Sequence, residues 1–265
     1  PGFTARYDSV LARVDHGEPG EPTASSAWPA AAESVDPAPE SPVQVELFVM
    51  PHCPYGMEAE AILAEVVREF GKGIEFRLSF LAEEAGKGGG DPGMRDPEPS
   101  QGRPACEGVP AEGSGRFLSL HGDEEVAEGI RQAAAAALYP DRYLDYILCR
   151  NKAIHRDNWK ACARSVGMDP GRLGAFASSA EGETLYAANI RRANRLGVRA
   201  SPTLLVDGEE VEAVFDTDAL SRRLCRETGE RRPCRDLPAC LSDRDCVRPG
   251  KVGVCVDPGR REARC

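Results

Sequence analysis

The chain has 265 residues, of which 41% are hydrophobic, and this is enough to bury one large core or two modest ones. Its formal net charge of -10 and its sequence pI near 5.1 argue against nucleic acid or an anionic membrane surface as the main partner. No apolar run approaches the roughly 18 to 20 residues of a membrane-spanning helix. The first residue is Pro1, with neither an initiator Met nor a signal-peptide core behind it, so we expect a processed or trimmed chain.

The N-terminal residues 1–42 are expected to form a tether. Residues 18–42 contain six prolines among alanine, serine and glutamate, a composition typical of an extended and poorly ordered segment. The folded domain is therefore expected to begin near Val43 and to extend to residue 229.

A strand, a cysteine-containing loop and a helix should follow. The apolar run Val45–Met50 predicts a short buried strand, and apolar residues on a helical period predict a helix over residues 58–70 that ends at Gly71. The sequence PHCPYG, residues 51–56, lies between the two. Alternating apolar and polar residues over 73–80 predict a second strand, and a right-handed crossover would make it parallel to the first.

The PHCPYG segment has the layout of a Cys-X-X-Cys redox site with only its first cysteine. Cys53 precedes a predicted helix, whose N-terminal N–H groups stabilise a thiolate, and a protonated His52 would add to that effect. Gly56 takes the place of the second cysteine, so a mixed disulfide on Cys53 needs an external thiol or another protein cysteine for its release. Motif spacing alone leaves open whether Cys53 is such a redox thiol or a permanently paired or buried one.

A long loop and a group of helices are predicted next. Residues 86–116 are rich in glycine and proline and predict an irregular loop, and Asp123 predicts the cap of a helix that runs to Leu138. The helical pattern continues from residue 140 or 141 toward Cys149, from Asp157 to about Gly167, and in two short helices that start at Asp169–Pro170 and at Glu181. Loop and helices together make residues 81–196 an insertion.

The last predicted elements are a strand that follows a proline, a hairpin and a helix. Pro202 immediately precedes a strand over 203–206, and Asp207-Gly208 predicts a turn into a second strand over 210–215. A helix over 216–227 closes the unit.

This order of elements resembles the thioredoxin fold in its DsbA-like form. The resemblance depends on PHCPYG and on Ser201-Pro202-Thr203, two motifs about 150 residues apart on either side of a helical insertion. The fold class expected from it is α/β, a thioredoxin-like fold with a helical insertion, to which a small disulfide-rich C-terminal module is added.

The resemblance also implies an activity and its residues. Cys53 would exchange disulfides with protein thiols or disulfides, and Pro202, in a cis peptide bond, would face its sulfur. Neither a cofactor nor a metal is expected. The residues that would line the surface for an extended substrate peptide are Pro54, Tyr55, Ser201 and Thr203.

The cysteines indicate the compartment. Six of the ten fall in the last 41 residues, a density typical of a disulfide-stapled module, here residues 230–265, in an oxidising space. A zinc site is the weaker alternative, because the chain has no C-x-x-C pair and no histidine after His155. We therefore expect a periplasmic or extracellular protein. The six residues are Cys225, Cys234, Cys240, Cys246, Cys255 and Cys265.

Parity suggests how the other four cysteines pair. Cys149 and Cys162 are separated by twelve residues and suit a bridge between neighbouring helices. If the six C-terminal cysteines pair among themselves, Cys53 and Cys106 remain. Cys106 lies in the long loop, so it could act as a resolving cysteine for Cys53 or cap it as a fixed bridge.

Two functions are compatible with this sequence. The first is thiol-disulfide exchange through Cys53, alone or with Cys106. The second is a redox-inactive thioredoxin-fold scaffold or accessory subunit of a larger extracytoplasmic assembly, which the acidic composition and the cysteine-rich tail also suit. Glu58, Glu60 and Glu65 are predicted to form a solvated helix face, with tuning of the Cys53 thiolate by one of them as the weaker alternative. His121 and His155 are predicted to be isolated surface or capping residues.

Overall fold

The computed structural model describes residues 42–85, 105–107, 115–212 and 214–228. The predicted tether up to residue 41 and the predicted cysteine-rich module of residues 230–265 lie outside these residues. Within the described ranges, no helix has the length and apolar character needed to cross a membrane.

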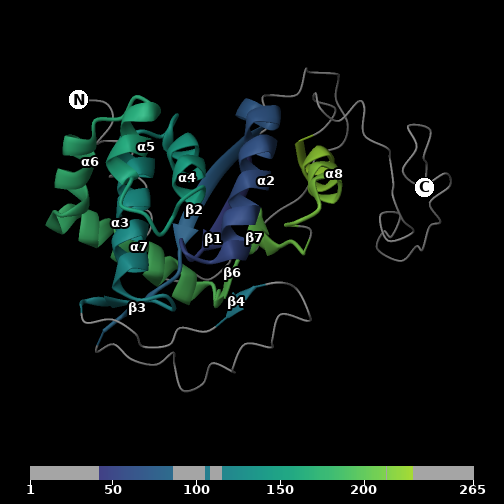
Figure 1. The fold of residues 1–265 in the computed structure, drawn as a ribbon. Helices are drawn as coiled ribbons and strands as arrows, with labels where there is room; N and C mark the ends of the chain where they lie inside the picture. The colour runs from purple at the N-terminus through teal and green to yellow at the C-terminus, as the bar shows by residue number, and fades with distance from the viewer. Residues whose placement is uncertain (1–41, 86–104, 108–114, 213, 229–265) are drawn as a thin grey trace, which may run out of the picture. The chain divides into compact units, whose positions relative to one another are not determined.

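A four-stranded sheet in the order β2-β1-β7-β8 forms the centre of the fold (Figure 1). β1 (Val43–Val49) pairs in parallel with β2 (Ile74–Phe80), as the sequence predicted, and antiparallel with β7 (Thr203–Val206). β7 pairs antiparallel with β8 (Glu209–Glu210), which is shorter than the predicted strand over 210–215. The expected turn is present, since Asp207 and Gly208 both have positive φ.

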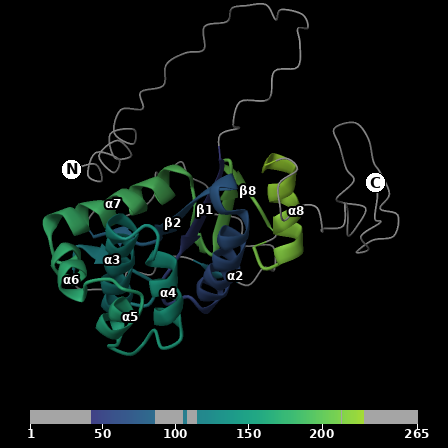
Figure 2. The ribbon, with the colours of Figure 1, turned by 90° about the horizontal axis from the view of Figure 1, so that it is seen from above.

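Helices cover both faces of the sheet. α2 (Pro54–Phe70) and α8 (Thr217–Thr228) pack on one face and α7 (Ala180–Arg195) on the other (Figure 2). A short 3-10 helix, η1 (Gly71–Gly73), links α2 to β2. α2 begins four residues earlier than predicted, because Pro54 at the first helical position needs no N–H partner and already has a helical φ.

Four more helices form the insertion: α3 (Asp123–Leu138), α4 (Tyr143–Asn151), α5 (Trp159–Ser165) and α6 (Pro170–Ala177). α3 contacts β2, α4, α6 and α7, so it joins the insertion to the sheet. The cap of α3 is Gly122 rather than the predicted Asp123, which begins the helix instead. α7 is 16 residues long and not short as predicted. It begins one residue before the predicted Glu181, and Ser179 caps it by accepting a hydrogen bond from the Gly182 N–H.

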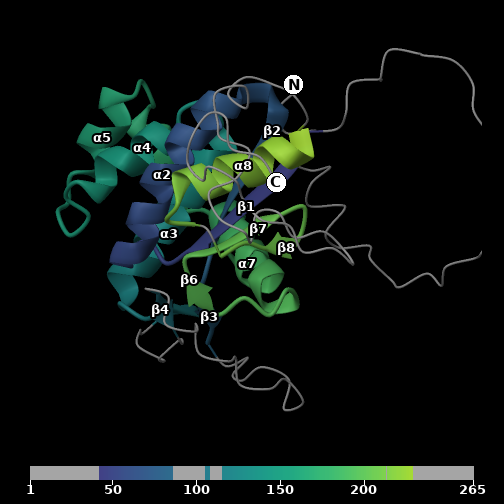
Figure 3. The same ribbon diagram turned by 90° about the vertical axis from the view of Figure 1, so that its right-hand side faces the viewer.

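Two short ladders lie outside the central sheet. β3 (Glu83–Glu84) pairs antiparallel with β5 (Phe117–Leu118), and β4 (Cys106–Glu107) pairs antiparallel with β6 (Ala200–Ser201). In Figures 1 and 3, β3, β4 and β6 lie at the same end of the molecule, the end at which β1 leads into α2. The sequence predicted only an irregular loop over 86–116, since a two-residue strand has no periodicity to detect.

A buried polar network joins α2 to the insertion. Glu128 accepts hydrogen bonds from Arg131, Gln132 and Arg150. Burial opposes the charge of Glu128, but the two arginines hold the pKa of its carboxyl below the ordinary value. Glu60 was predicted to be solvated and is only 2% exposed, because its side chain points toward α4, where it accepts a hydrogen bond of 2.6 Å from Asn151 Nδ2.

The substitution Glu60→Gln should remove a pH-dependent loss of stability. Burial raises the pKa of Glu60 from 4.5 to about 8, so between these pH values the folded chain keeps a proton that the unfolded chain releases. The contribution of this group to stability is therefore complete below pH 4.5 and is lost as the pH rises toward 8. In urea unfolding at a series of pH values, we expect the variant to exceed wild type by roughly 2 to 4 kcal/mol at the alkaline end.

The matched control is Glu65→Gln, an exposed position on the same helix, which should leave the slope of stability against pH unchanged. Parallel profiles for wild type and Glu60→Gln would contradict the assignment of a buried, protonated Glu60.

Candidate active site

Cys53 occupies the N-cap position of α2 and is completely buried, with 0% of its surface exposed. Its side chain belongs to an apolar cluster. The other buried members of this cluster are Phe48, Met50, Leu81, Ala193, Val198 and Leu205. Cys53 is therefore shielded from solvent on the side of the sheet.

Cys53 is bonded to Cys106, with the two Cα atoms 6.0 Å apart. Cys106 is half-buried and packs, together with Leu120, against the apolar cluster around Cys53. The described cysteines include no free thiol. Cys149 is bonded to Cys162, the pairing expected from their spacing, and Cys225 on α8 is also disulfide-bonded, to none of these four.

Ser201 joins the elements of the site. The Ser201–Pro202 peptide bond is cis, the conformation that the family resemblance implied. The Ser201 carbonyl oxygen lies 3.3 Å from Cys53 Sγ, and its Oγ accepts a hydrogen bond of 2.9 Å from the Met50 N–H. Ser201 is also the ladder partner of Cys106, so it contacts both halves of the disulfide.

Gly56 stands where no side chain fits without a shift of its neighbours. A Cβ added there would lie 2.9 Å from Ser201 Oγ and 3.3 Å from the Met50 carbonyl oxygen. Ser201 Oγ cannot turn away freely, because it is the acceptor for the buried Met50 N–H. A cysteine at position 56 is thus opposed by the packing of α2 against β6.

The first turn of α2 presents backbone donors to Cys53. The Cys53 carbonyl oxygen accepts the Met57 N–H at 3.0 Å, and Pro54 has no N–H. The N–H groups of Tyr55 and Gly56 occupy helix positions N2 and N3, which have no acceptor within the helix and which an atom of the N-cap side chain can reach. In the disulfide-bonded state the Cys53 side chain accepts no hydrogen bond from this turn; a thiolate released there would lie at the positive end of the dipole of a 17-residue helix.

His52 does not supply positive charge at neutral pH. Burial lowers its pKa below the ordinary 6.5 and outweighs the opposing effect of the Glu125 carboxylate. His121 and His155, predicted as isolated, instead lie beside it, with ring centroids 6.4 Å and 5.1 Å from that of His52. In the described part of the chain, no set of three or more ligating side chains is arranged to hold a metal ion.

Glu125 is a site residue that the sequence did not reveal. It is completely buried and accepts hydrogen bonds from the His52 N–H at 2.7 Å, from the His121 N–H at 3.1 Å and from Ser119 Oγ. It therefore ties the residue before Cys53 to the turn that leads into α3. In the sequence it looks like an ordinary acidic residue of a first helical turn; only its position three residues before Glu128 and seven before Gln132, on one helix face, could have indicated burial.

The predicted peptide-binding residues differ in accessibility. Pro54 and Tyr55 are exposed, and Tyr55 is 38% exposed. Ser201 and Thr203 are buried, and Thr203 Oγ1 donates to the Ala200 carbonyl oxygen. Contact with a partner would thus use the side chains of Pro54 and Tyr55 but only the backbone near Ser201.

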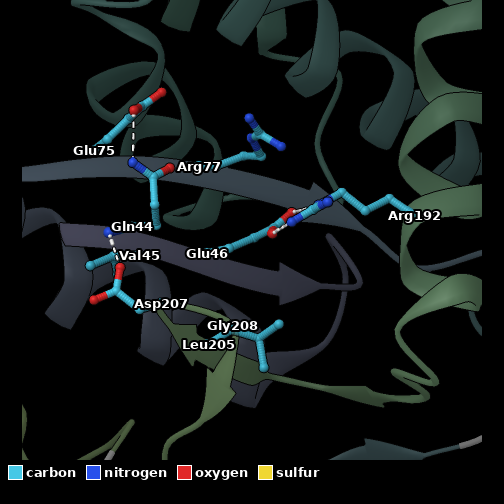
Figure 4. Close-up of a pocket in the computed structure, with 9 residues that line it drawn as sticks. All are labelled: Gln44, Val45, Glu46, Glu75, Arg77, Arg192, Leu205, Asp207 and Gly208. Atoms are coloured by element: carbon cyan, nitrogen blue, oxygen red, sulfur yellow. Dashed lines mark hydrogen bonds and ion pairs between the residues drawn. The ribbon is translucent and has the colours of Figure 1, made fainter. Parts of the chain in front are cut away.

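A cavity of about 330 Å³ lies at the start of β1, whereas Cys53 follows the end of that strand. Glu46 and Arg192 point toward one another across it and form a bidentate ion pair (Figure 4). Carboxylates slightly outnumber guanidinium groups in its lining, which contains neither cysteine of the site. This charge pair ties α7 to β1 and satisfies the buried Glu46.

Comparison with known proteins gives a family match and several similar solved structures. The family described as DSBA-like thioredoxin domain matches residues 44–224. A search of curated proteins gave no match. Similar solved structures include oxidised BdbD from Bacillus subtilis, with 12% identity, 71% of this chain and 89% of that one covered, and a TM-score of 0.49. Another is MdbA, a thiol-disulfide oxidoreductase from Corynebacterium diphtheriae, with 14% identity, 70% of this chain and 84% of that one covered, and a TM-score of 0.45.

The contact between Gly56 and Ser201 can be measured by a double-mutant cycle. Gly56→Ala should cost about 1 to 2 kcal/mol of stability through overpacking, and Ser201→Ala should cost a similar amount by leaving the Met50 N–H unpaired. Because Ser201→Ala removes the clashing atom, the double variant should lose about 0.5 to 1.5 kcal/mol less than the sum in urea unfolding.

Gly115→Ala is the matched control, since an added Cβ there has open space, and it should change stability by less than about 0.5 kcal/mol. Strict additivity of Gly56→Ala and Ser201→Ala would show that the two side chains do not compete for the same space.

Proposed function

This chain belongs to the DSBA-like thioredoxin domain family, and from that membership we propose that it exchanges thiols and disulfides with other proteins outside the cytoplasm, using Cys53 and Cys106 as its redox pair. The observation that carries the proposal is the bond between the N-cap cysteine of α2 and a cysteine of β4, beside the cis peptide bond. Cys106 supplies the second sulfur that Gly56 does not.

The proposed cycle begins with reduction of the disulfide. Cys53 is buried and Cys106 is half-buried, so an incoming thiolate reaches Cys106 Sγ, bonds to it and displaces Cys53 as a thiolate. A second external thiolate then attacks the external sulfur of this mixed disulfide. The two external sulfurs leave as a disulfide, and Cys106 is released as a thiolate. Two external thiols are oxidised, and the protein disulfide takes up their two electrons.

The reduced protein can then act on a protein disulfide. The Cys53 thiolate attacks one substrate sulfur and displaces the other, and the Cys106 thiolate attacks Cys53 Sγ, which restores the Cys53–Cys106 bond and releases the reduced substrate. Every step is reversible, so the redox state of the partners sets the direction. No cofactor takes part in this cycle.

The two described disulfides differ in how well the nearby helix end would stabilise a released thiolate. Cys53 as a leaving thiolate meets the N-terminus of α2, whereas Cys149 lies in the last turn of α4, where the carbonyl groups disfavour negative charge. We therefore assign exchange to Cys53–Cys106 and a structural role to Cys149–Cys162.

The other site residues are proposed to support this chemistry. Pro202 and Ser201 keep the backbone of β6 beside the sulfurs, and Pro54 and Tyr55 offer exposed surface to a protein substrate. His52, uncharged at neutral pH, is proposed to position the loop through its N–H bond to Glu125 rather than to attract the thiolate.

The location follows from the same cysteines. Disulfides at Cys53–Cys106, at Cys149–Cys162 and at Cys225 suit an oxidising space, which we propose to be the periplasm or the exterior of the cell. In the proposed arrangement, residues 43–229 form the exchange domain, residues 1–42 a tether and residues 230–265 a stapled module, whose five cysteines form disulfides among themselves and with Cys225.

One observation favours a different function. Complete burial of Cys53 beneath Cys106 is also what a fixed bridge would show, in which case the chain would be a redox-inactive scaffold that binds a larger extracytoplasmic assembly. The two functions differ in whether Cys53 is activated once it is free.

Single-cysteine variants of the pair distinguish them. Cys106→Ala leaves Cys53 free at the helix N-terminus, and it should form a mixed disulfide with a peptide disulfide near neutral pH at least about ten times faster than Cys53→Ala, which leaves only Cys106. Added glutathione should release the peptide from Cys106→Ala, because that variant has no resolving cysteine. Mass spectrometry of acid-quenched samples gives both rates.

Cys149→Ala/Cys162→Ala, with the Cys53–Cys106 bond intact, is the control and should form no such adduct without added thiol. Equal and ordinary rates for the two single variants would support the scaffold and contradict the exchange function.

A further inference from the structure

β4 lies against β6 in the way that an extended peptide adds to the edge of a sheet. Cys106 is opposite Ser201 and Glu107 is opposite Ala200, in antiparallel register. β6 ends at Ser201, and Pro202, which follows it, has no N–H with which to extend this ladder. Main-chain pairing of this kind recognises an extended backbone largely without regard to its sequence.

The sulfur of Cys106 occupies the place that a substrate sulfur needs. It is bonded to Cys53 Sγ, and Cys53 Sγ in turn lies 3.3 Å from the Ser201 carbonyl oxygen. A substrate joined to Cys53 through a disulfide must place its own sulfur at this point. Substrate and β4 therefore exclude one another.

β4 also covers the apolar surface around the sulfur. Cys106 packs on the cluster that contains Met50, Leu81 and Val198, and Cys53 beneath it is completely buried. Removal of β4 would expose part of this cluster together with the β6 edge. The uncovered surface would be apolar and would lie next to the backbone of Ala200 and Ser201.

The connections of β4 are anchored independently of the disulfide. β3 and β5, which precede and follow β4 in the chain, pair with each other through Glu83–Leu118 and Glu84–Phe117. The Ala85 N–H extends this closure by donating to the Arg116 carbonyl oxygen at 2.8 Å. Breaking the Cys53–Cys106 bond thus leaves the base of the loop closed, while β4 retains only two ladder positions, a pairing that is marginal in water.

We propose that β4 is a built-in substrate strand: it fills the peptide-binding edge of β6 while Cys53–Cys106 is oxidised, and reduction of that bond opens the edge to an extended, cysteine-containing segment of another protein. The inference rests on the proposed function, since it takes Cys53 as the sulfur that exchanges. It makes peptide binding dependent on redox state, with affinity in the reduced chain and exclusion in the oxidised one.

The electrons balance as in the proposed cycle. In the open chain, the Cys53 thiolate attacks one sulfur of a substrate disulfide. The substrate S–S bond breaks, a bond forms between Cys53 Sγ and the attacked sulfur, and the other substrate sulfur leaves as a thiolate. When Cys106 attacks Cys53 Sγ, the Cys53–Cys106 bond forms and the second substrate sulfur leaves, so β4 replaces the substrate strand in the step that completes the reaction. Product release and site closure are then one event.

The test is a binding experiment that needs no thiol chemistry. The probe is a fluorescently labelled peptide with the sequence of residues 103–109, RPACEGV, in which 2-aminobutyrate replaces the cysteine. The fluorescence anisotropy of this peptide is measured as oxidised wild type, Cys106→Ala or Cys53→Ala/Cys106→Ala is added. We expect both variants to bind at least tenfold more tightly than oxidised wild type. A probe that is N-methylated at its three central residues should lose binding, because it has no N–H left at the ladder positions.

Cys149→Ala/Cys162→Ala, which lacks a disulfide elsewhere, should bind as poorly as oxidised wild type. The proposal is overturned if oxidised wild type binds as tightly as the two variants, or if neither variant binds at millimolar chain concentration. Circular dichroism checks their folding, and Cys106→Ala keeps the buried Cys53 side chain in place. If the variants do not bind the probe but Cys106→Ala exchanges fast, the built-in strand is wrong and the proposed function stands. If the variants bind the probe but Cys53 shows ordinary thiol reactivity, the peptide-binding edge stands and the exchange function is wrong.

Discussion

Ser201 is the residue on which the arrangement of the site depends, because three of its groups hold three different elements. Its Oγ accepts the Met50 N–H at the end of β1, its carbonyl oxygen contacts Cys53 Sγ, and its backbone pairs with Cys106. The same Oγ closes the space beside Gly56. One side chain thus fixes the loop before α2 and opposes a cysteine in the first turn of that helix.

That constraint explains why the second sulfur comes from so far away. Cys106 is 53 residues from Cys53 in sequence and reaches it through a ladder of only two residues. In a Cys-X-X-Cys site both sulfurs move with one helix, whereas here one belongs to α2 and the other to a separate strand. Redox change at such a pair can alter which backbone occupies the β6 edge, and this is why chemistry and recognition are coupled in our account.

The sequence predicted the elements with strong periodicity and missed what depends on contacts. The parallel pairing of β1 with β2 and the strand after Pro202 were predictable, because apolar runs and a strand-initiating proline are local signals. Burial of Glu60 and the approach of His121 and His155 to His52 arise from packing between distant segments and have no local signature. Burial of Glu125 is indicated only by the helix face that it shares with Glu128 and Gln132. Parity left Cys53 and Cys106 together but could not distinguish a resolving cysteine from a fixed bridge.

The central claim, that Cys53–Cys106 is an exchanging pair, is tested most directly by the redox equilibrium of the native chain. The protein is incubated in glutathione buffers of graded potential, quenched with acid, alkylated and mapped by mass spectrometry, with Cys149–Cys162 as the internal reference. Both disulfides join one buried and one half-buried cysteine, so accessibility does not separate them. We predict that Cys53–Cys106 is partly reduced in buffers that leave Cys149–Cys162 fully oxidised; resistance of both bonds to the same buffers would contradict the account.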